Sequence, residues 1–312
     1  MKLFFSILFV CLYNVLIAQE TKLPLEMKGS HLFSQWKLDD TIDVKVFLET
    51  GFPRIVFSEK FAKEYLQGTT NMVEAPEDTF ITLWNNDNQK IKVTYFINDS
   101  LIINGEKLKI DALVADVKNQ KSWASRDMVF PLRDLKGKVE LNIDEKYMKI
   151  LDYTELLSTD FFEYDVMSDS RTRGLYMTTT MQIFDAFGEK EELKGNFLLD
   201  LGAAGAFFLN KNLSEVVEFV SLSDRMMLKD TTLFKQNPKT ELSIIMPERI
   251  QVNNIEITGN FIAAMKIFAS NASNNYVGII GNSFFANFVI VFDFENNKFY
   301  IKPNSDRVKV IK

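Results

Sequence analysis

The chain has 312 residues, of which 46% are hydrophobic and 25% charged, and its net charge at pH 7 is -6. This length and composition indicate a globular protein with one large or two ordinary domains and a substantial core. A chain without a surplus of Lys and Arg neutralises few phosphates, so nucleic acid and anionic membranes are not expected as partners. The 28 Phe residues, with frequent Ile, Val and Thr, favour β structure.

Residues 1–18 are predicted to form a secretory signal peptide. A lysine and an apolar run precede the small residue Ala18, and cleavage is expected before Gln19. A membrane anchor is the alternative, but the apolar run is shorter than the about 20 residues that span a bilayer. The only cysteine, Cys11, lies in this segment, so the mature chain would contain none. We therefore expect a secreted, periplasmic or cell-envelope protein of a bacterium, with no stable membrane span after cleavage.

Several kinds of catalytic site are excluded by the residues that the chain lacks. It has one histidine, His31, and no cysteine after the signal peptide, so the usual zinc sites are not available. A Ser-His-Asp triad would have to use His31, and no G-x-S-x-G motif accompanies it. No P-loop or G-x-G-x-x-G motif is present. If the protein is an enzyme, carboxylates must perform the chemistry, and we expect no metal and no cofactor.

The two halves of the chain carry the same landmarks in the same order. In the first half an apolar strand at 44–48 ends at Glu49, and in the second half a strand at 196–199 ends at Asp200, 151 positions later. Each acid is followed two residues later by a glycine. An apolar strand is then predicted at 55–57 in the first half and at 206–209 in the second, and a helical segment follows it at 59–66 and at 213–220.

Later landmarks keep nearly the same spacing. They are the hairpins at 101–108 and 250–257, whose Asn-Gly and Asn-Asn turns tolerate positive φ, the apolar segments at 129–131 and 279–281, and the apolar-Asp pairs at 143–144 and 292–293. A constant offset of this kind indicates an internal repeat. We predict two homologous β-rich lobes at 23–153 and 174–303, joined by a linker at 154–173.

The segment 277–285, with the strand at 288–293 behind it, resembles the end of a lobe in aspartic peptidases of the pepsin and retropepsin type. The apolar-apolar-acid-x-Gly loops at Glu49 and Asp200 are similar to the catalytic loops of the same family. The resemblance spans nearly all of the mature sequence. It implies a mainly β fold, with two homologous pepsin/retropepsin-like β-barrel lobes and a cleft between them.

The resemblance assigns the catalytic dyad to Glu49 and Asp200. In this family two carboxyl groups a few ångströms apart share one proton, and one activates water while the other protonates the peptide carbonyl. A glycine after each acid lets the two loops approach closely, and a hydroxyl residue links them. The supporting residues that the resemblance implies are Thr50, Gly51, Leu201, Gly202 and Gly281.

The chain departs from the family pattern at several of these positions. Glu49 stands in place of Asp, and its extra methylene moves the carboxylate by about 1 Å, a displacement that costs up to about 100-fold in rate. Leu201 stands where a Thr or Ser hydroxyl is expected, so one hydrogen bond between the lobes should be missing. Pro131 replaces the glycine of the first apolar-apolar-Gly segment, and Phe52-Pro53 replace small residues after the first loop.

Two polar hairpin tips, at 85–90 in the first lobe and at 235–239 in the second, are candidates for a flap over the cleft. Trp84 and Tyr95, which flank the first tip, are candidates for lining a peptide groove. The alternative is that both are ordinary cross-strand aromatic residues.

Three functions use these carboxylates differently. The first is an aspartic-type endopeptidase that hydrolyses peptide or protein substrates with the Glu49 and Asp200 dyad and an activated water. The alternative is a catalytically inactive pseudo-protease that binds an extended peptide in the cleft by strand addition. The third, a glycoside hydrolase, needs carboxyl groups about 5 to 9.5 Å apart and is disfavoured by the repeat. Nothing in the sequence indicates an oligomeric state or a cleavage preference.

Overall fold

The computed structural model describes residues 22–29, 31–82, 90–117, 125–169, 173–184, 188–203, 205–210, 213, 215–216, 249–258, 265–268 and 276–311. The predicted signal peptide, Trp84 and the predicted flap tip at 235–239 lie outside these residues, as do most of the flap tip at 85–90 and of the helical segment predicted at 213–220. Within them, no helix is both long enough and apolar enough to cross a membrane.

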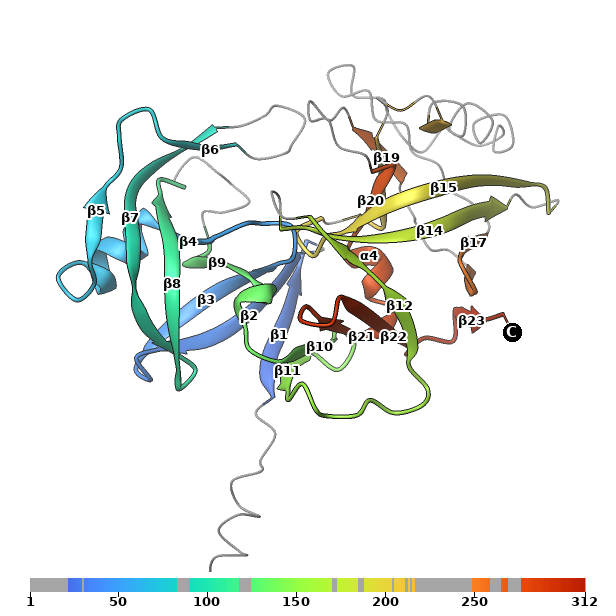
Figure 1. Cartoon of the computed structure of the whole chain (residues 1–312), viewed down its shortest axis with the longest axis horizontal. Coiled ribbons are helices and arrows are strands. Elements are labelled where there is room, and N and C mark those ends of the chain that lie inside the picture. Colours follow the sequence, from blue (N-terminus) through green and yellow to red (C-terminus); the bar gives the residue numbers. More distant parts are fainter. Residues whose placement is uncertain are drawn as a thin grey trace, which may run out of the picture.

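The described strands form two sheets, one of 14 and one of 9 strands (Figure 1). The larger sheet contains β1 (Leu23–Lys28), β2 (His31–Leu38), β3 (Ile42–Glu49), β4 (Ile55–Ser58), β5 (Met72–Glu74), β6 (Phe80–Thr82), β7 (Lys90–Ile103), β8 (Glu106–Ala115), β9 (Met128–Pro131), β10 (Lys138–Asn142), β11 (Tyr147–Leu151), β12 (Phe162–Asp165), β21 (Phe288–Asp293) and β22 (Lys298–Pro303). The smaller sheet contains β13 (Met167–Ser168), β14 (Leu175–Phe184), β15 (Lys190–Leu199), β16 (Phe207–Asn210), β17 (Arg249–Val252), β18 (Ile255–Thr258), β19 (Met265–Phe268), β20 (Gly278–Ile280) and β23 (Val308–Val310). The short helices are α2 (Glu59–Phe61), η1 (Ala62–Leu66), η2 (Leu132–Asp134) and α4 (Asn282–Phe285).

The predicted internal repeat is present as a repeat of strand pairings. The strand that leads to each acid, β3 or β15, pairs in parallel with the later apolar segment, β9 or β20. That segment pairs antiparallel with the strand after the acid, β4 or β16. These strands pair in parallel with β8 and β19, respectively. Two halves of the chain therefore reach the same topology around Glu49 and Asp200.

The prediction of a mainly β protein is confirmed, but that of two closed barrels is not. In the larger sheet β7 returns to β2 through one residue pair, Leu38 with Ile103. The described strands of the smaller sheet follow an open order from β19 to β23.

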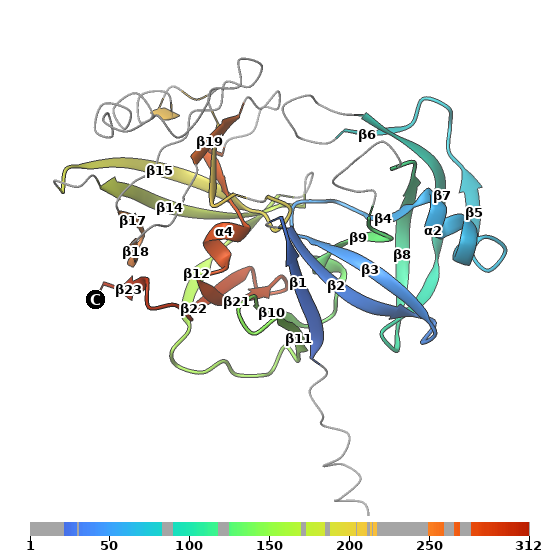
Figure 2. The same ribbon diagram turned by 180° about the vertical axis from the view of Figure 1, so that it is seen from behind.

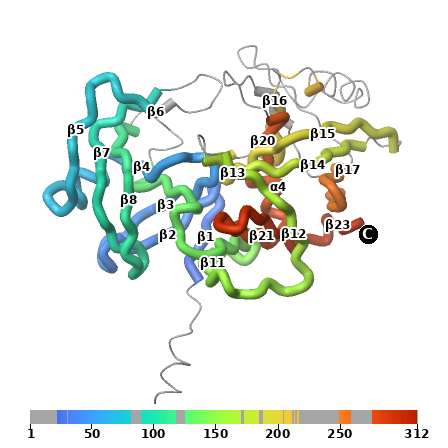
Figure 3. Tube along the Cα trace, in the orientation of Figure 1, coloured from blue at the N-terminus to red at the C-terminus, as the bar shows by residue number. Residues whose placement is uncertain are grey.

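The two halves share a six-stranded region that the sequence did not predict. Its order is β12-β22-β21-β10-β11-β1, so the linker strand β12 and two strands of the second half continue directly into three strands of the first half. The central contact is the antiparallel pair of β10 and β21, in which Leu141 lies opposite Ile290. Figures 1 and 2 show these strands below the point where the halves meet, and in Figure 3 the red tube of β21 lies beside the first half. The predicted linker at 154–173 contains β12 and β13, which pair with β22 and β14.

Local sequence signals account for the turns and the first helix. Asn104 and Gly105 have φ values of 51° and 81° in the β7–β8 turn, and Asn253 has a φ of 52° between β17 and β18, as expected of residues that tolerate the left-handed region. The hydroxyl of Ser58 accepts a hydrogen bond from the N–H of Phe61 and so caps α2.

Phenylalanine rings fill the core beside the shared strands. Phe285 and Phe299 both pack against Phe292 of β21, with ring centroids 6.4 and 5.1 Å away. Phe292 has no exposed surface. Because β21 is hydrogen-bonded to β10 of the other half, this cluster supports both halves.

Replacing Phe292 with Ala is expected to lower the free energy of unfolding by about 3–5 kcal/mol, because it leaves a cavity within this cluster. Phe80, whose side chain is 47% exposed, offers a matched control, and Phe80→Ala should change stability by no more than about 0.5 kcal/mol. Urea unfolding followed by circular dichroism measures both. Equal stability of the two variants would contradict the importance of the cluster.

Candidate active site

Glu49 and Asp200 occupy equivalent positions in the two halves. Glu49 is the last residue of β3 and lies opposite Pro131 of β9 in the parallel pair. Asp200 directly follows β15, and its N–H donates to the carbonyl of Ile280 at 2.9 Å. In each half the strand before the acid is thus fixed by the apolar segment that pairs with it.

The glycines after the two acids bring the loops together. A Cβ atom built on Gly51 would lie 3.4 Å from Oδ1 of Asp200, and one built on Gly202 would overlap the Glu49 carboxylate. Each glycine therefore faces the acid of the other half. Each also donates its N–H to the acid of its own loop, from Gly51 to Glu49 Oε2 at 3.3 Å and from Gly202 to Asp200 Oδ1 at 2.7 Å.

Thr50 links the two loops by two buried hydrogen bonds. Its hydroxyl donates to the carbonyl of Leu199 at 2.8 Å and accepts from the N–H of Leu201 at 3.0 Å. The corresponding residue in the second loop, Leu201, is fully buried in the main apolar core. As the sequence predicted, the link from the second loop to the first lacks a side-chain hydroxyl.

The segment after β20 supports the second loop from behind. A Cβ atom on Gly281 would come within 2.6 Å of the carbonyl of Ala203, so only glycine fits there without a shift. The next residue, Asn282, has no exposed surface, and its side-chain amide donates to the carbonyl of Leu201. Sequence reasoning identified Gly281 but missed Asn282, for which its position directly after that glycine was the available signal.

Glu49 is buried and Asp200 is half-buried, and their carboxyl groups are hydrogen-bonded to each other. Burial raises the pKa of Glu49 well above its ordinary value, and the charge of Asp200 and the hydrogen bond to it raise it further. Burial also raises the pKa of Asp200, while hydrogen bonds from the Gly202 N–H, Glu49 and the Ala203 N–H oppose that rise. Two such carboxyls cannot both ionise readily, so the pair holds one proton.

The surroundings favour Glu49 as the carrier of that proton. Asp200 accepts a short backbone hydrogen bond at 2.7 Å from Gly202 and is also bonded by Ala203, which stabilises its ionised form. Glu49 accepts only the longer bond from Gly51 and is 8% exposed. The pair is therefore asymmetric, and Glu49 holds the shared proton more readily than Asp200 does.

A buried arginine lies near Glu49 and was missed in the sequence. Arg126 is 5% exposed. Burial lowers its pKa to about 10, against the opposing effect of Glu49. It lies two residues before β9, which pairs with the strand of Glu49, but nothing in the sequence marks it as buried.

Three other residues singled out in the sequence, Tyr95, Phe52 and Pro53, pack within the first half or against the linker. Tyr95 is half-buried in β7 and packs against the main core, as the cross-strand alternative expected. Phe52 packs against a second apolar cluster in the first half. The carbonyl of Pro53 accepts a hydrogen bond from Arg173 at 2.7 Å.

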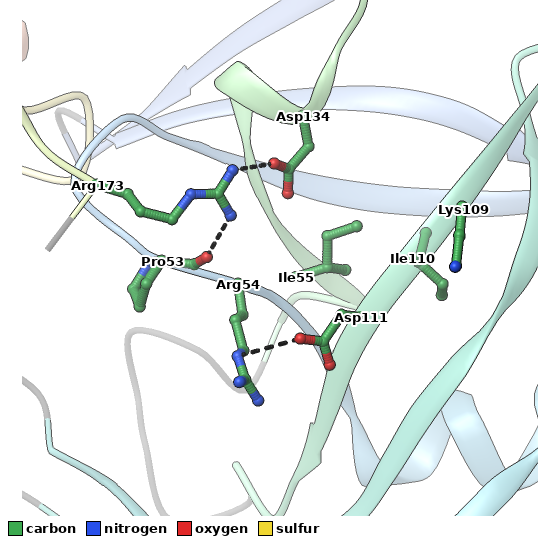
Figure 4. Close-up of a pocket in the computed structure, with 8 residues that line it drawn as sticks. All are labelled: Pro53, Arg54, Ile55, Lys109, Ile110, Asp111, Asp134 and Arg173. Atoms are coloured by element: carbon green, nitrogen blue, oxygen red, sulfur yellow. Dashed lines mark hydrogen bonds and ion pairs between the residues drawn. The ribbon is translucent and has the colours of Figure 1, made fainter. Parts of the chain in front are cut away.

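A pocket of about 460 Å³ lies beside the segment that follows the first loop. Figure 4 shows its walls, in which Arg173 at the end of the predicted linker reaches Pro53 and Asp134, and Arg54 pairs with Asp111. Neither dyad acid lines it. The pocket therefore marks a polar contact between the first half and the linker rather than the site of the dyad.

Among the described residues, no group of three or more His, Cys, Asp or Glu side chains is placed to hold a metal ion. A comparison with models of known protein families finds no match, and a comparison with curated proteins finds no similar sequence.

Thr50→Val is expected to lower the free energy of unfolding by about 1–3 kcal/mol, because it removes the hydroxyl that pairs with the buried Leu199 carbonyl and Leu201 N–H. Thr50→Ser keeps the hydroxyl and should cost less than about 1 kcal/mol. Guanidinium unfolding of both variants measures the difference. If Thr50→Val and Thr50→Ser unfolded at the same denaturant midpoint, the hydrogen bonds of the Thr50 hydroxyl would not contribute to stability.

Folding raises the pKa of both dyad acids, so above about pH 4 the folded pair binds more protons than the unfolded chain does, and stability falls as the pH rises. Asp200→Asn removes one raised pKa and the repulsion on Glu49. We expect its Tm to exceed that of the wild type by at least about 2 °C at pH 7, with no gain below pH 4.

Thermal unfolding between pH 3 and pH 8 tests this expectation. Asp144→Asn, a change at an exposed turn, is the control and should follow the wild-type curve. A gain for Asp200→Asn that is equal at pH 3 and pH 7 would rule out a proton-linked cause.

Proposed function

We propose that the protein is an aspartic-type endopeptidase that hydrolyses peptide bonds with Glu49 and Asp200. The observation that carries this proposal is the pair of hydrogen-bonded carboxyl groups, one from each half, at the ends of equivalent strands. A pair that shares one proton offers a base and an acid at the same point, which peptide hydrolysis without a metal requires.

In this proposal the two carboxyls have separate roles. Ionised Asp200 removes a proton from a water molecule, whose oxygen forms a bond to the peptide carbonyl carbon. Protonated Glu49 gives its proton to the carbonyl oxygen, so the tetrahedral intermediate is neutral. The C–N bond then breaks as the amine takes the proton from Asp200, and Glu49 recovers its own proton from the intermediate's hydroxyl group.

The fold supports this proposal in two ways. The repeated pairings around the acids and the six-stranded region shared by the halves are features that two related lobes facing each other would have. The direct hydrogen bond between the carboxyls brings them closer than the about 5 to 9.5 Å that glycoside hydrolases need. Peptide chemistry therefore fits the pair better.

Peptides and proteins outside the cytoplasm are the proposed substrates. The predicted signal peptide points to the periplasm, the cell envelope or the medium, and we propose that the protein acts there. The raised pKa of Glu49 keeps the pair singly protonated over a wider pH range than ordinary carboxyls would allow.

A pseudo-protease that binds extended peptides is the second candidate. The apolar side chain of Leu201, fully buried in place of a hydroxyl residue, favours it, as does the longer acid at position 49. This candidate keeps the cleft and the peptide-binding function but predicts no turnover.

The test is cleavage of a peptide library by the chain from Gln19 onward, between pH 3 and pH 7, read by mass spectrometry. We expect cleavage that is reduced at least about 10³-fold in Asp200→Asn, which loses the base but keeps an acceptor for the Gly202 N–H. Cleavage that survives in this variant would refute the dyad, and binding without cleavage by folded wild type would establish the second candidate.

A further inference from the structure

An apolar layer lies on the same face of β3 as the carboxyl group of Glu49. Alternate residues of a strand share a face, so Phe47 and Glu49 point to one side while Leu48 packs into the main core. Phe47 belongs to a separate cluster, which we call the dyad-side layer. Its buried members are Phe33, Phe47, Val56, Ile81, Ile91, Val93, Ala115, Val117 and Val129.

The hairpin of β6 and β7 packs on this layer. Ile81 of β6 lies opposite Ile91 of β7, and both are buried members of the layer, as is Val93. The layer therefore extends from the strand that carries Glu49 to the described parts of β6 and β7.

Arg126 is the charged residue that packs on the layer. Its guanidinium carbon lies 3.9 Å from the ring centroid of Phe47 and 4.9 Å from that of Phe33. Its Nε atom is buried without a hydrogen-bond partner. Within the described part of the chain, no carboxylate forms an ion pair with Arg126.

The backbone around Arg126 is held without help from its guanidinium. The next residue, Asp127, exchanges hydrogen bonds with Lys45, from its N–H to the carbonyl at 3.0 Å and from the Lys45 N–H to its carboxylate at 2.9 Å. Its carbonyl also accepts from the N–H of Ser58 at 2.9 Å. The side chain of Arg126 is therefore presented from a fixed position, and the local fold does not need its charge.

This guanidinium lacks a full counter-charge while the dyad holds its proton. Glu49 is the acid whose charge affects Arg126, and in the asymmetric pair Glu49 is the protonated member. Burial of a cation without an anion costs several kcal/mol, and a bound anion would offset that cost. A planar guanidinium stacked on aromatic rings is suited to a carboxylate, which it binds by two parallel hydrogen bonds.

We propose that Arg126 is a specificity residue that binds the carboxylate of a Glu or Asp side chain of the peptide, on the first half's side of the dyad. This inference rests on the proposed peptide-binding site and names the substrate class that the site prefers. Arg126 would bind the charged end of that side chain, and the rings of Phe47 and Phe33 hold its guanidinium in place.

Paired peptides that differ only by Glu or Gln at one position, scanned along the library's cleavage site, test this proposal at pH 6, where the Glu side chain is ionised. We expect one position at which wild type prefers Glu by about 10- to 100-fold in kcat/KM. Arg126→Met should abolish that preference, and Arg126→Lys should keep only part of it. Arg307→Met, a change at an exposed arginine, is the control and should retain the full preference.

Two results would overturn the proposal. One is the absence of a Glu preference at any position in the wild type. The other is an equal loss for the Glu and Gln peptides in Arg126→Met, together with a shifted pH profile, which would mean that Arg126 acts on the proton of Glu49 instead.

A binding measurement separates failure of this inference from failure of the proposed function. Fluorescence anisotropy of the same labelled peptides with Asp200→Asn protein needs no turnover. A Glu preference that Arg126→Met removes in this background would support the specificity role even if the wild type cleaves nothing. Equal affinity for Glu and Gln peptides, from a protein that does cleave, would refute the role of Arg126 alone.

Discussion

The structure depends on one shared proton between two hydrogen-bonded carboxyl groups from distant parts of the chain. Two ionised carboxylates at hydrogen-bonding distance would repel each other strongly, and burial would add a further penalty. The raised pKa values of Glu49 and Asp200 favour a shared proton, which makes the close approach of the two loops tolerable. The glycines that face the opposite acids and the hydroxyl of Thr50 serve this same approach.

The two halves contribute unequally to this arrangement. The first half supplies Thr50, which joins the loops through polar contacts, whereas the second half supplies Leu201, which joins the core through apolar contacts. Asn282 then bonds the carbonyl of Leu201 from behind, so the second loop is held by its own half. The Glu49 loop therefore bonds to the other half through Thr50, whereas the Asp200 loop is held by Asn282 of its own half.

Much of this arrangement could be predicted from the chain, because the repeat fixes equivalent positions. The offset between Glu49 and Asp200 predicted equivalent strand ends, and Asn104-Gly105 predicted the β7–β8 turn. The pairing of β10 with β21 was not predictable, because the sequence of a short apolar strand does not indicate which other strand it will pair with. Arg126 was missed because its importance comes from burial on Phe47, and a single arginine in a sequence gives no sign of burial.

The pairing of β10 with β21 constrains the order in which the chain can fold. β10 can pair with β21 only after the second half has been synthesised, because Leu141 of β10 lies opposite Ile290 of β21. The ribosome completes the first half well before it reaches Ile290. Until then β10 presents an unpaired edge, which is a template for association with other chains. A newly made first half is thus an incomplete folding unit. Export as an unfolded chain, with folding after release of the C-terminus, would protect this edge during synthesis.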